Sequence, residues 1–235
     1  MMKKFIGIFG KKGLLVILYL SVVIAGLIST HEKGTRAVGV FSVASGKKVV
    51  LIDAGHGEWD SGKRGRNDTI EKDINLLIAD KLGSFLELSG AFVVRTRSDD
   101  NALGTTKRED LKSRKDMSAE LGADIFVSIH QNSYPRERVR GAQTFYYGNS
   151  EEGERLATTI QSQLKALADP DNNREAKASM DYYILKNATV PAVIVECGFL
   201  SNDEESELLN GDEYQNKVAW AIYAGIVRYF EESAP

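Results

Sequence analysis

Strand-like segments alternate with helix-like segments from Lys48 almost to the C-terminus, and this alternation limits the possible folds more than any other feature. Runs rich in Val, Ile, Phe and Tyr predict strands at 48–54, 91–96, 124–130, 142–147, 182–185 and 192–197. Apolar residues at three-and-four spacing predict helices at about 71–88, 107–121, 151–168 and 214–232. The sequence therefore predicts a single α/β domain, a three-layer α/β/α sandwich around a mostly parallel sheet of roughly six strands.

The N-terminal segment has a different character. An uncharged stretch from Gly13 to Ile28 follows several lysines, which place the N-terminus in the cytoplasm. The stretch is about the minimum length for a bilayer span and slightly long for a signal-peptide core. No clear cleavage site follows it, so a removed signal peptide and an uncleaved membrane anchor both stay open. We expect a signal peptide or anchor at 1–28, a tether at 29–46 and an exported domain at 47–233.

Charge and cysteine content exclude some partners. Residues 1–48 contain eight Lys or Arg and one acidic residue, while the whole chain has 30 basic and 33 acidic residues. The domain is therefore acidic, which argues against nucleic acid or wall polyanions as partners held by charge. The single cysteine, Cys197, lies in an apolar run and is expected to be a core residue without a disulfide partner.

Four polar side chains are predicted to meet at one edge of the sheet. His56 directly follows the first strand, His130 ends the third, and Glu196 lies near the end of the last. Ligand sites in open parallel sheets form outside the carboxyl ends of the strands. Glu71 begins the helix that follows the first strand, on the face that carries the helix's apolar residues. Its side chain should therefore point inward at the same edge.

Each of these residues also has a purely structural explanation. A histidine after a strand is often a hydrogen-bonded loop residue, and Glu71 is favoured at a helix N-terminus by the macrodipole. Glu196 is harder to explain in this way, because a buried carboxylate requires a metal, a lysine or a functional cavity. Together the residues favour a metal site, since a catalytic zinc ion takes three protein ligands and leaves a fourth position open. A set of two histidines and a glutamate can also hold other divalent ions.

The surroundings of these residues are less sharply defined. The loop at 57–70 contains Gly57, Gly62 and Gly65, which allow sharp backbone turns near a ligand. Asp53 could orient a ligand imidazole from behind, or equally serve a hydrogen-bonding role within its strand. The third histidine of the chain, His31, lies in the tether and is expected to take no part.

Five ordered sequence blocks resemble the zinc-dependent N-acetylmuramoyl-L-alanine amidases of bacterial cell-wall turnover. The resemblance runs from about residue 48 to about residue 232. The blocks are Ile52–Gly57, Glu71–Asp73, Thr96–Asp99, Ser128–Ser133 and Pro191–Asn202. Two positions depart from the usual pattern, since Ala54 replaces a proline and Glu58 replaces a glycine beside Gly-His-Gly. Arg114 and Arg174 lie where relatives often have arginine, and for both we expect a structural salt bridge rather than a substrate contact.

The resemblance implies a role for each residue of the site. His56, Glu71 and His130 would bind one zinc ion, and Glu196 would be the catalytic carboxylate. The substrate would be peptidoglycan, cut at the amide bond between N-acetylmuramic acid and L-alanine of the stem peptide. Relatives of this type are controlled by activators, so a protein that stabilises the metal-bound state is a further expected partner.

The short format, one domain behind an apolar N-terminal segment, most resembles the sporulation-linked amidases that prepare the spore cortex. This places the protein outside the cytoplasmic membrane, anchored or secreted, in the space around the developing spore. Two alternatives remain. One is a zinc peptidase that cuts within the stem peptide. The other is a membrane-tethered protein that binds peptidoglycan or regulates another enzyme through a decayed site.

Overall fold

The computed structural model describes residues 47–65 and 68–233, which form one sheet with helices on both faces. The predicted signal or anchor at 1–28 and the tether at 29–46, with His31, lie outside the described residues. Within the described ranges, no helix combines the length and apolarity needed to cross a bilayer.

The sheet has six strands in the order β2-β1-β3-β6-β4-β5. Strand β4 runs antiparallel to β6, and the other neighbouring strands are parallel. The predicted mostly parallel sheet is therefore confirmed. The strands are β1 (Val49–Ala54), β2 (Phe92–Arg95), β3 (Ile125–Asn132), β4 (Gln143–Tyr147), β5 (Lys177–Ser179) and β6 (Ala192–Phe199).

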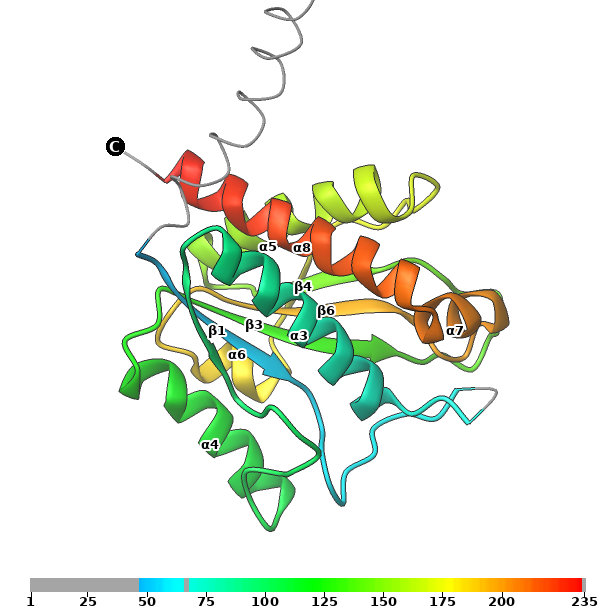
Figure 1. The fold of residues 1–235 in the computed structure, drawn as a ribbon, viewed down its shortest axis with the longest axis horizontal. Coiled ribbons are helices and arrows are strands. Elements are labelled where there is room, and N and C mark those ends of the chain that lie inside the picture. Colours follow the sequence, from blue (N-terminus) through cyan, green and yellow to red (C-terminus); the bar gives the residue numbers. More distant parts are fainter. Residues whose placement is uncertain (1–46, 66–67, 234–235) are drawn as a thin grey trace, which may run out of the picture. The chain divides into compact units, whose positions relative to one another are not determined.

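The helices form the two outer layers (Figure 1). One face of the sheet is covered by α3 (Glu71–Leu88), α5 (Glu151–Gln163) and α8 (Asp212–Glu232), and the other by α4 (Lys107–Glu120) and α6 (Tyr183–Asn187). A π-helical turn at Leu164–Ala168 continues α5, and α7 (Asp203–Asn210) precedes α8. This arrangement is the predicted three-layer α/β/α sandwich.

The apolar face of α3 fixes the position of the site. Ile74, Ile78, Leu82 and Leu86 recur every three or four residues and are fully or almost fully buried in the core between the sheet and α8. Burial of one such side chain stabilises the fold by roughly 1.5–3 kcal/mol. This packing holds the first turn of α3 at the edge of the sheet where β1 and β3 end.

Three details of the predicted secondary structure were wrong or missing. The segment 182–185, predicted as a strand, forms the start of α6, because a run of four apolar residues satisfies either structure and here Ile184 and Leu185 pack onto the sheet face. The sixth strand is instead β5, whose residues lack any strand pattern and pair with β4 at the edge. Helix α7 was not predicted.

Candidate metal centre

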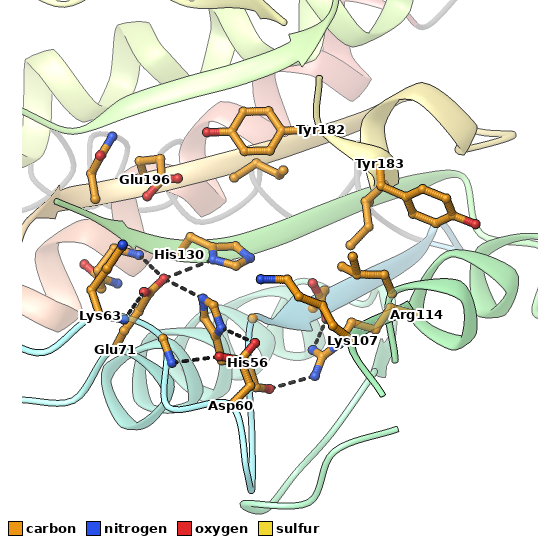
Figure 2. Close-up of a pocket in the computed structure, with 18 of the residues that line it drawn as sticks. His56, Asp60, Lys63, Glu71, Lys107, Arg114, His130, Tyr182, Tyr183 and Glu196 are labelled. Carbon is orange, nitrogen blue, oxygen red and sulfur yellow. Dashed lines mark hydrogen bonds and ion pairs between the residues drawn. The ribbon is translucent and has the colours of Figure 1, made fainter. Parts of the chain in front are cut away.

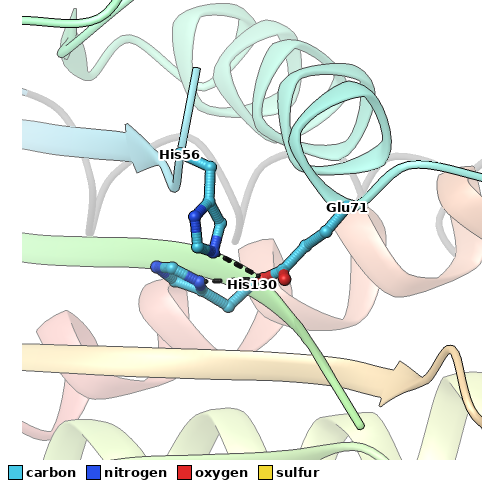
Figure 3. Close-up of side chains that lie close together, drawn as sticks. All are labelled: His56, Glu71 and His130. Atoms are coloured by element: carbon cyan, nitrogen blue, oxygen red, sulfur yellow. Dashed lines mark hydrogen bonds and ion pairs between the residues drawn. The ribbon is translucent and has the colours of Figure 1, made fainter. Parts of the chain in front are cut away.

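The predicted convergence of His56, Glu71 and His130 is present in the structure (Figure 3). His56 follows the end of β1, His130 lies within β3, and Glu71 is the first residue of α3. Strands β1 and β3 are parallel neighbours with Ala54 opposite Ile129, so the two imidazoles are delivered to the same edge. The first turn of α3 brings the carboxylate to them.

Both imidazoles contact the same oxygen atom of Glu71. Glu71 Oε1 lies 3.1 Å from His56 Nε2 and 3.0 Å from His130 Nδ1. One ligand atom from each residue lies within 4.8 Å of the other two, close enough to share one ion after small side-chain rotations. Two imidazoles and one carboxylate form a donor set used by catalytic zinc sites. The residues present therefore fit a zinc ion.

Glycines leave the space that these side chains occupy. A Cβ atom at position 55 would lie 2.3 Å from His130 Cε1 and Nε2, so the imidazole rests directly on the backbone of Gly55. A Cβ atom at position 62 would lie 2.5 Å from Glu71 Oε2, and Gly62 has a φ of +65°. His56 itself adopts a φ of +66°, a left-handed conformation that is uncommon outside glycine.

Backbone donors hold the Glu71 carboxylate. The Lys63 N–H donates to Oε2 at 2.7 Å, and the Gln131 N–H donates to Oε1 at 3.1 Å. Burial alone would raise the pKa of Glu71, but the imidazoles of His130 and His56 hold this pKa well below its usual range. The carboxylate is therefore ionised and oriented, as a metal ligand must be.

Asp60, rather than Asp53, places a carboxylate against the His56 imidazole. His56 Nδ1 lies 2.9 Å from Asp60 Oδ2, and the Gly62 N–H donates to Asp60 Oδ1 at 3.1 Å. Asp53, the residue considered for this role, lies in a different network. Its carboxylate accepts hydrogen bonds from Arg114, Ser128 and Thr96, so its hydrogen-bonding role within the strand is the one observed.

Replacing Asp60 by Asn should weaken zinc binding by about 10- to 100-fold, because the amide cannot supply the negative charge that makes the His56 imidazole a stronger ligand. Competition with a chelating dye would measure the zinc dissociation constant. Asp68→Asn, in the same loop but without a contact to either histidine in the described residues, is the matched control. Equal zinc affinity in Asp60→Asn and the parent would exclude this role for Asp60.

Two buried arginines fix the loop that carries His56. Arg114 forms the expected salt bridge, with Nη1 2.7 Å from Asp53 Oδ1, and also donates to the His56 carbonyl oxygen at 2.7 Å. Arg97 donates to the carbonyl oxygens of Gly55 and Lys72, which ties the end of β1 to the start of α3. Loss of one partner from a buried ion pair costs about 3–5 kcal/mol.

Arg174 does not form the salt bridge that was expected of it. Its guanidinium group lies over the Phe199 ring, 4.6 Å from the centroid, and donates to the Arg140 carbonyl oxygen and to Gln143. Among the described residues it makes no ion pair, since its hydrogen bonds go to a carbonyl oxygen and an amide oxygen instead.

Glu196 lies beside the three-residue cluster, in a cavity of about 600 Å³ (Figure 2). It is paired with His130 across β3 and β6 and is 8 % exposed. Its Oε2 atom has no well-aligned hydrogen-bond donor within the described part of the chain. Burial raises the pKa of Glu196 to about 7, a value suited to a group that both accepts and returns a proton.

The raised pKa of Glu196 should make the stability of the metal-free protein depend on pH. The folded state binds the Glu196 proton more tightly than the unfolded chain does. The free energy of unfolding therefore falls as pH rises from 4.5, the pKa of Glu196 in the unfolded chain, through about 7, its pKa in the folded protein. In a metal-chelating buffer, Glu196→Gln should therefore raise Tm at pH 8 and leave it unchanged at pH 4. Thermal melts at both pH values test this, and an equal change in Tm at both would contradict it.

Sequence reasoning missed two residues of this cavity. Asp60 was given no role in the site, although its spacing of four from His56 allows the contact. Tyr182 was assigned to a strand, and its place beside Glu196 depends on the turn into α6. No local pattern indicates that turn.

Comparison with known proteins identifies the family. Residues 50–228 match the family Amidase_3, described as N-acetylmuramoyl-L-alanine amidase. The germination-specific N-acetylmuramoyl-L-alanine amidase of Bacillus subtilis (strain 168) is 39% identical over 193 residues, which cover 79% of this chain and 81% of the relative.

Solved structures similar to this chain are also amidases. The CwlD amidase from Clostridioides difficile, in complex with the GerS lipoprotein, is 43% identical with a TM-score of 0.77, covering 79% of this chain and all of that one. The amidase AmiC2 of Nostoc punctiforme is 34% identical with a TM-score of 0.72, and the match covers 80% of this chain and 99% of that one. The chain therefore belongs to the N-acetylmuramoyl-L-alanine amidase family, as its sequence motifs predict, and is an amide hydrolase of peptidoglycan.

Proposed function

We propose that this amidase uses one zinc ion, held by His56, Glu71 and His130, with Glu196 as its catalytic carboxylate. The observation that carries the proposal is the meeting of two imidazoles and one ionised carboxylate at the edge of the sheet, inside a cavity that also contains Glu196. The bond cut joins the lactyl group of N-acetylmuramic acid to L-alanine of the stem peptide.

The chemistry divides between the ion and the protein. When bound, zinc polarises the scissile carbonyl group and lowers the pKa of water. Glu196 accepts a proton from the attacking water molecule and returns it to the departing amine, which would otherwise be a poor leaving group. Asp60 and the backbone donors of Lys63 and Gln131 keep the ligand side chains oriented.

The domain limits and the site of action form part of the proposal. Residues 47–233 would be the catalytic domain, 29–46 a tether, and 1–28 a signal peptide or a membrane anchor. Exported action is supported by the basic and apolar N-terminal pattern and by the cell-wall role of the family. A role in spore cortex maturation is supported by the germination-specific relative.

A protein partner is proposed on similar grounds. The CwlD amidase of Clostridioides difficile is described in complex with a lipoprotein, GerS. By analogy we infer an activator that stabilises the zinc-bound state of this chain, so zinc occupancy and activity should both rise when it is added. Stoichiometric zinc and full activity without a partner would argue against such an activator.

Mass analysis of peptidoglycan fragments tests the function directly. Zinc-loaded protein should release stem peptides with a free L-alanine amino group and leave an unsubstituted lactyl carboxylate on the glycan. Cleavage between amino acids of the stem would instead identify a peptidase. Binding to peptidoglycan without any release would identify a binding or regulatory protein.

A further inference from the structure

Tyr182 forms part of the cavity wall next to Glu196 (Figure 2). It is the N-cap residue of α6, with φ of −68° and ψ of 116°, so its backbone is still extended directly before the helix begins at Tyr183. Figure 2 shows its ring above β6, with the hydroxyl group on the side of Glu196. The side chain is half-buried.

Apolar contacts hold the Tyr182 ring in this position. Its centroid lies 5.5 Å from that of Phe145, with the two planes at 65°, an edge-to-face contact. The ring also packs against the buried apolar cluster that includes Phe126 and Ile194. A ring fixed on two sides presents its hydroxyl group at a defined point.

That hydroxyl group and the Glu196 carboxyl group line the same cavity and interact there, although no hydrogen bond of good geometry joins them. The Glu196 Oε2 atom nevertheless has no well-aligned donor in the described residues. Hydrogen bonds at active sites are often long or poorly aligned without substrate and tighten in the reacting complex. Burial and the nearby Glu196 charge raise the pKa of Tyr182 to about 12, so its hydroxyl group keeps its proton at neutral pH and acts as a donor.

We propose that Tyr182 is a positioning residue of this amidase, whose hydroxyl group holds the Glu196 carboxylate in the orientation needed to accept and return the proton. The inference rests on the proposed role of Glu196. Within β6, the Glu196 side chain could rotate about its own bonds, and a displacement of about 1 Å at a reacting group can cost about 10²-fold in rate. Tyr182, in the segment between β5 and α6, restricts this rotation.

Tyr182→Phe is the test, because it removes the hydroxyl group and keeps the ring that contacts Phe145. We expect kcat on a soluble muramoyl tripeptide to fall by about 10- to 100-fold, the value of a hydrogen bond to a charged group. KM should stay within about twofold and zinc affinity should not change, since neither depends on the orientation of Glu196. Tyr147→Phe is the matched control. Tyr147 packs against the same apolar cluster, and its hydroxyl group contacts Asn149 rather than Glu196.

A double-mutant cycle separates positioning from a general structural effect. If Tyr182 acts through Glu196, adding Tyr182→Phe to Glu196→Gln should change the residual rate by less than about twofold. An equal loss in both backgrounds, or a parental kcat in the single variant, would overturn the assignment of Tyr182. Failure of the parent protein to cut the lactyl amide bond would instead overturn the proposed function.

Discussion

Replacing Glu196 by glutamine should lower kcat by about 10²–10⁴-fold, the range contributed by a general acid-base group. Glutamine has nearly the same size but cannot accept the proton of the attacking water molecule or return it to the amine. Zinc content should stay at the parental value, because Glu196 lies outside the His56, Glu71 and His130 cluster. Release of stem peptide and elemental analysis of the same sample measure both quantities.

The control for this substitution is Glu207→Gln, on the exposed surface of α7, which should retain parental activity. Glu196→Asp provides a second comparison, because it keeps the carboxyl group but withdraws it by one methylene group. We expect Glu196→Asp to keep partial activity, above that of Glu196→Gln. Full activity of Glu196→Gln would mean that another group accepts the proton.

The parts of the fold that the sequence predicts well are those with long, regular patterns. The apolar runs of β1, β3 and β6 and the three-and-four spacing of α3 predict both their structure and the side they bury. Because parallel strands end at a common edge, the positions of His56 and His130 at two strand ends were enough to predict their meeting. The position of Glu71 could be predicted because it begins α3, the helix that follows β1 and starts at the same edge of the sheet.

The loops around the site could not be predicted in the same way. The contact between His56 and Asp60 depends on left-handed backbone at His56, Glu58 and Gly62, of which only the glycine is indicated by the sequence. The contact between Tyr182 and Glu196 depends on a short helix that four apolar residues do not distinguish from a strand. Both contacts are set by tertiary packing rather than by local pattern.

Replacing His130 by alanine should abolish zinc binding and activity together. The substitution leaves two of the three proposed ligands and removes the imidazole that contacts Glu71 Oε1 at 3.0 Å. Zinc in a catalytic site is held by three protein ligands, so loss of one should lower occupancy to background at equimolar metal. Elemental analysis after gel filtration measures the zinc, and circular dichroism shows whether the variant is folded. Retention of stoichiometric zinc would exclude His130 as a ligand.

Gly55→Ala gives a second route to the same result without removing any ligand. The new Cβ atom would lie 2.3 Å from the His130 ring, so the imidazole must move away from its present position. The backbone of Gly55 does not have a positive φ, so alanine is compatible with its conformation. Zinc should therefore be lost from a folded protein that still contains all four site residues. Glu196→Gln should show the opposite pattern, with zinc retained and activity lost. If Gly55→Ala instead kept parental zinc affinity, the position of the His130 ring would not matter for the metal, and the imidazole would have to be removed from the proposed ligand set.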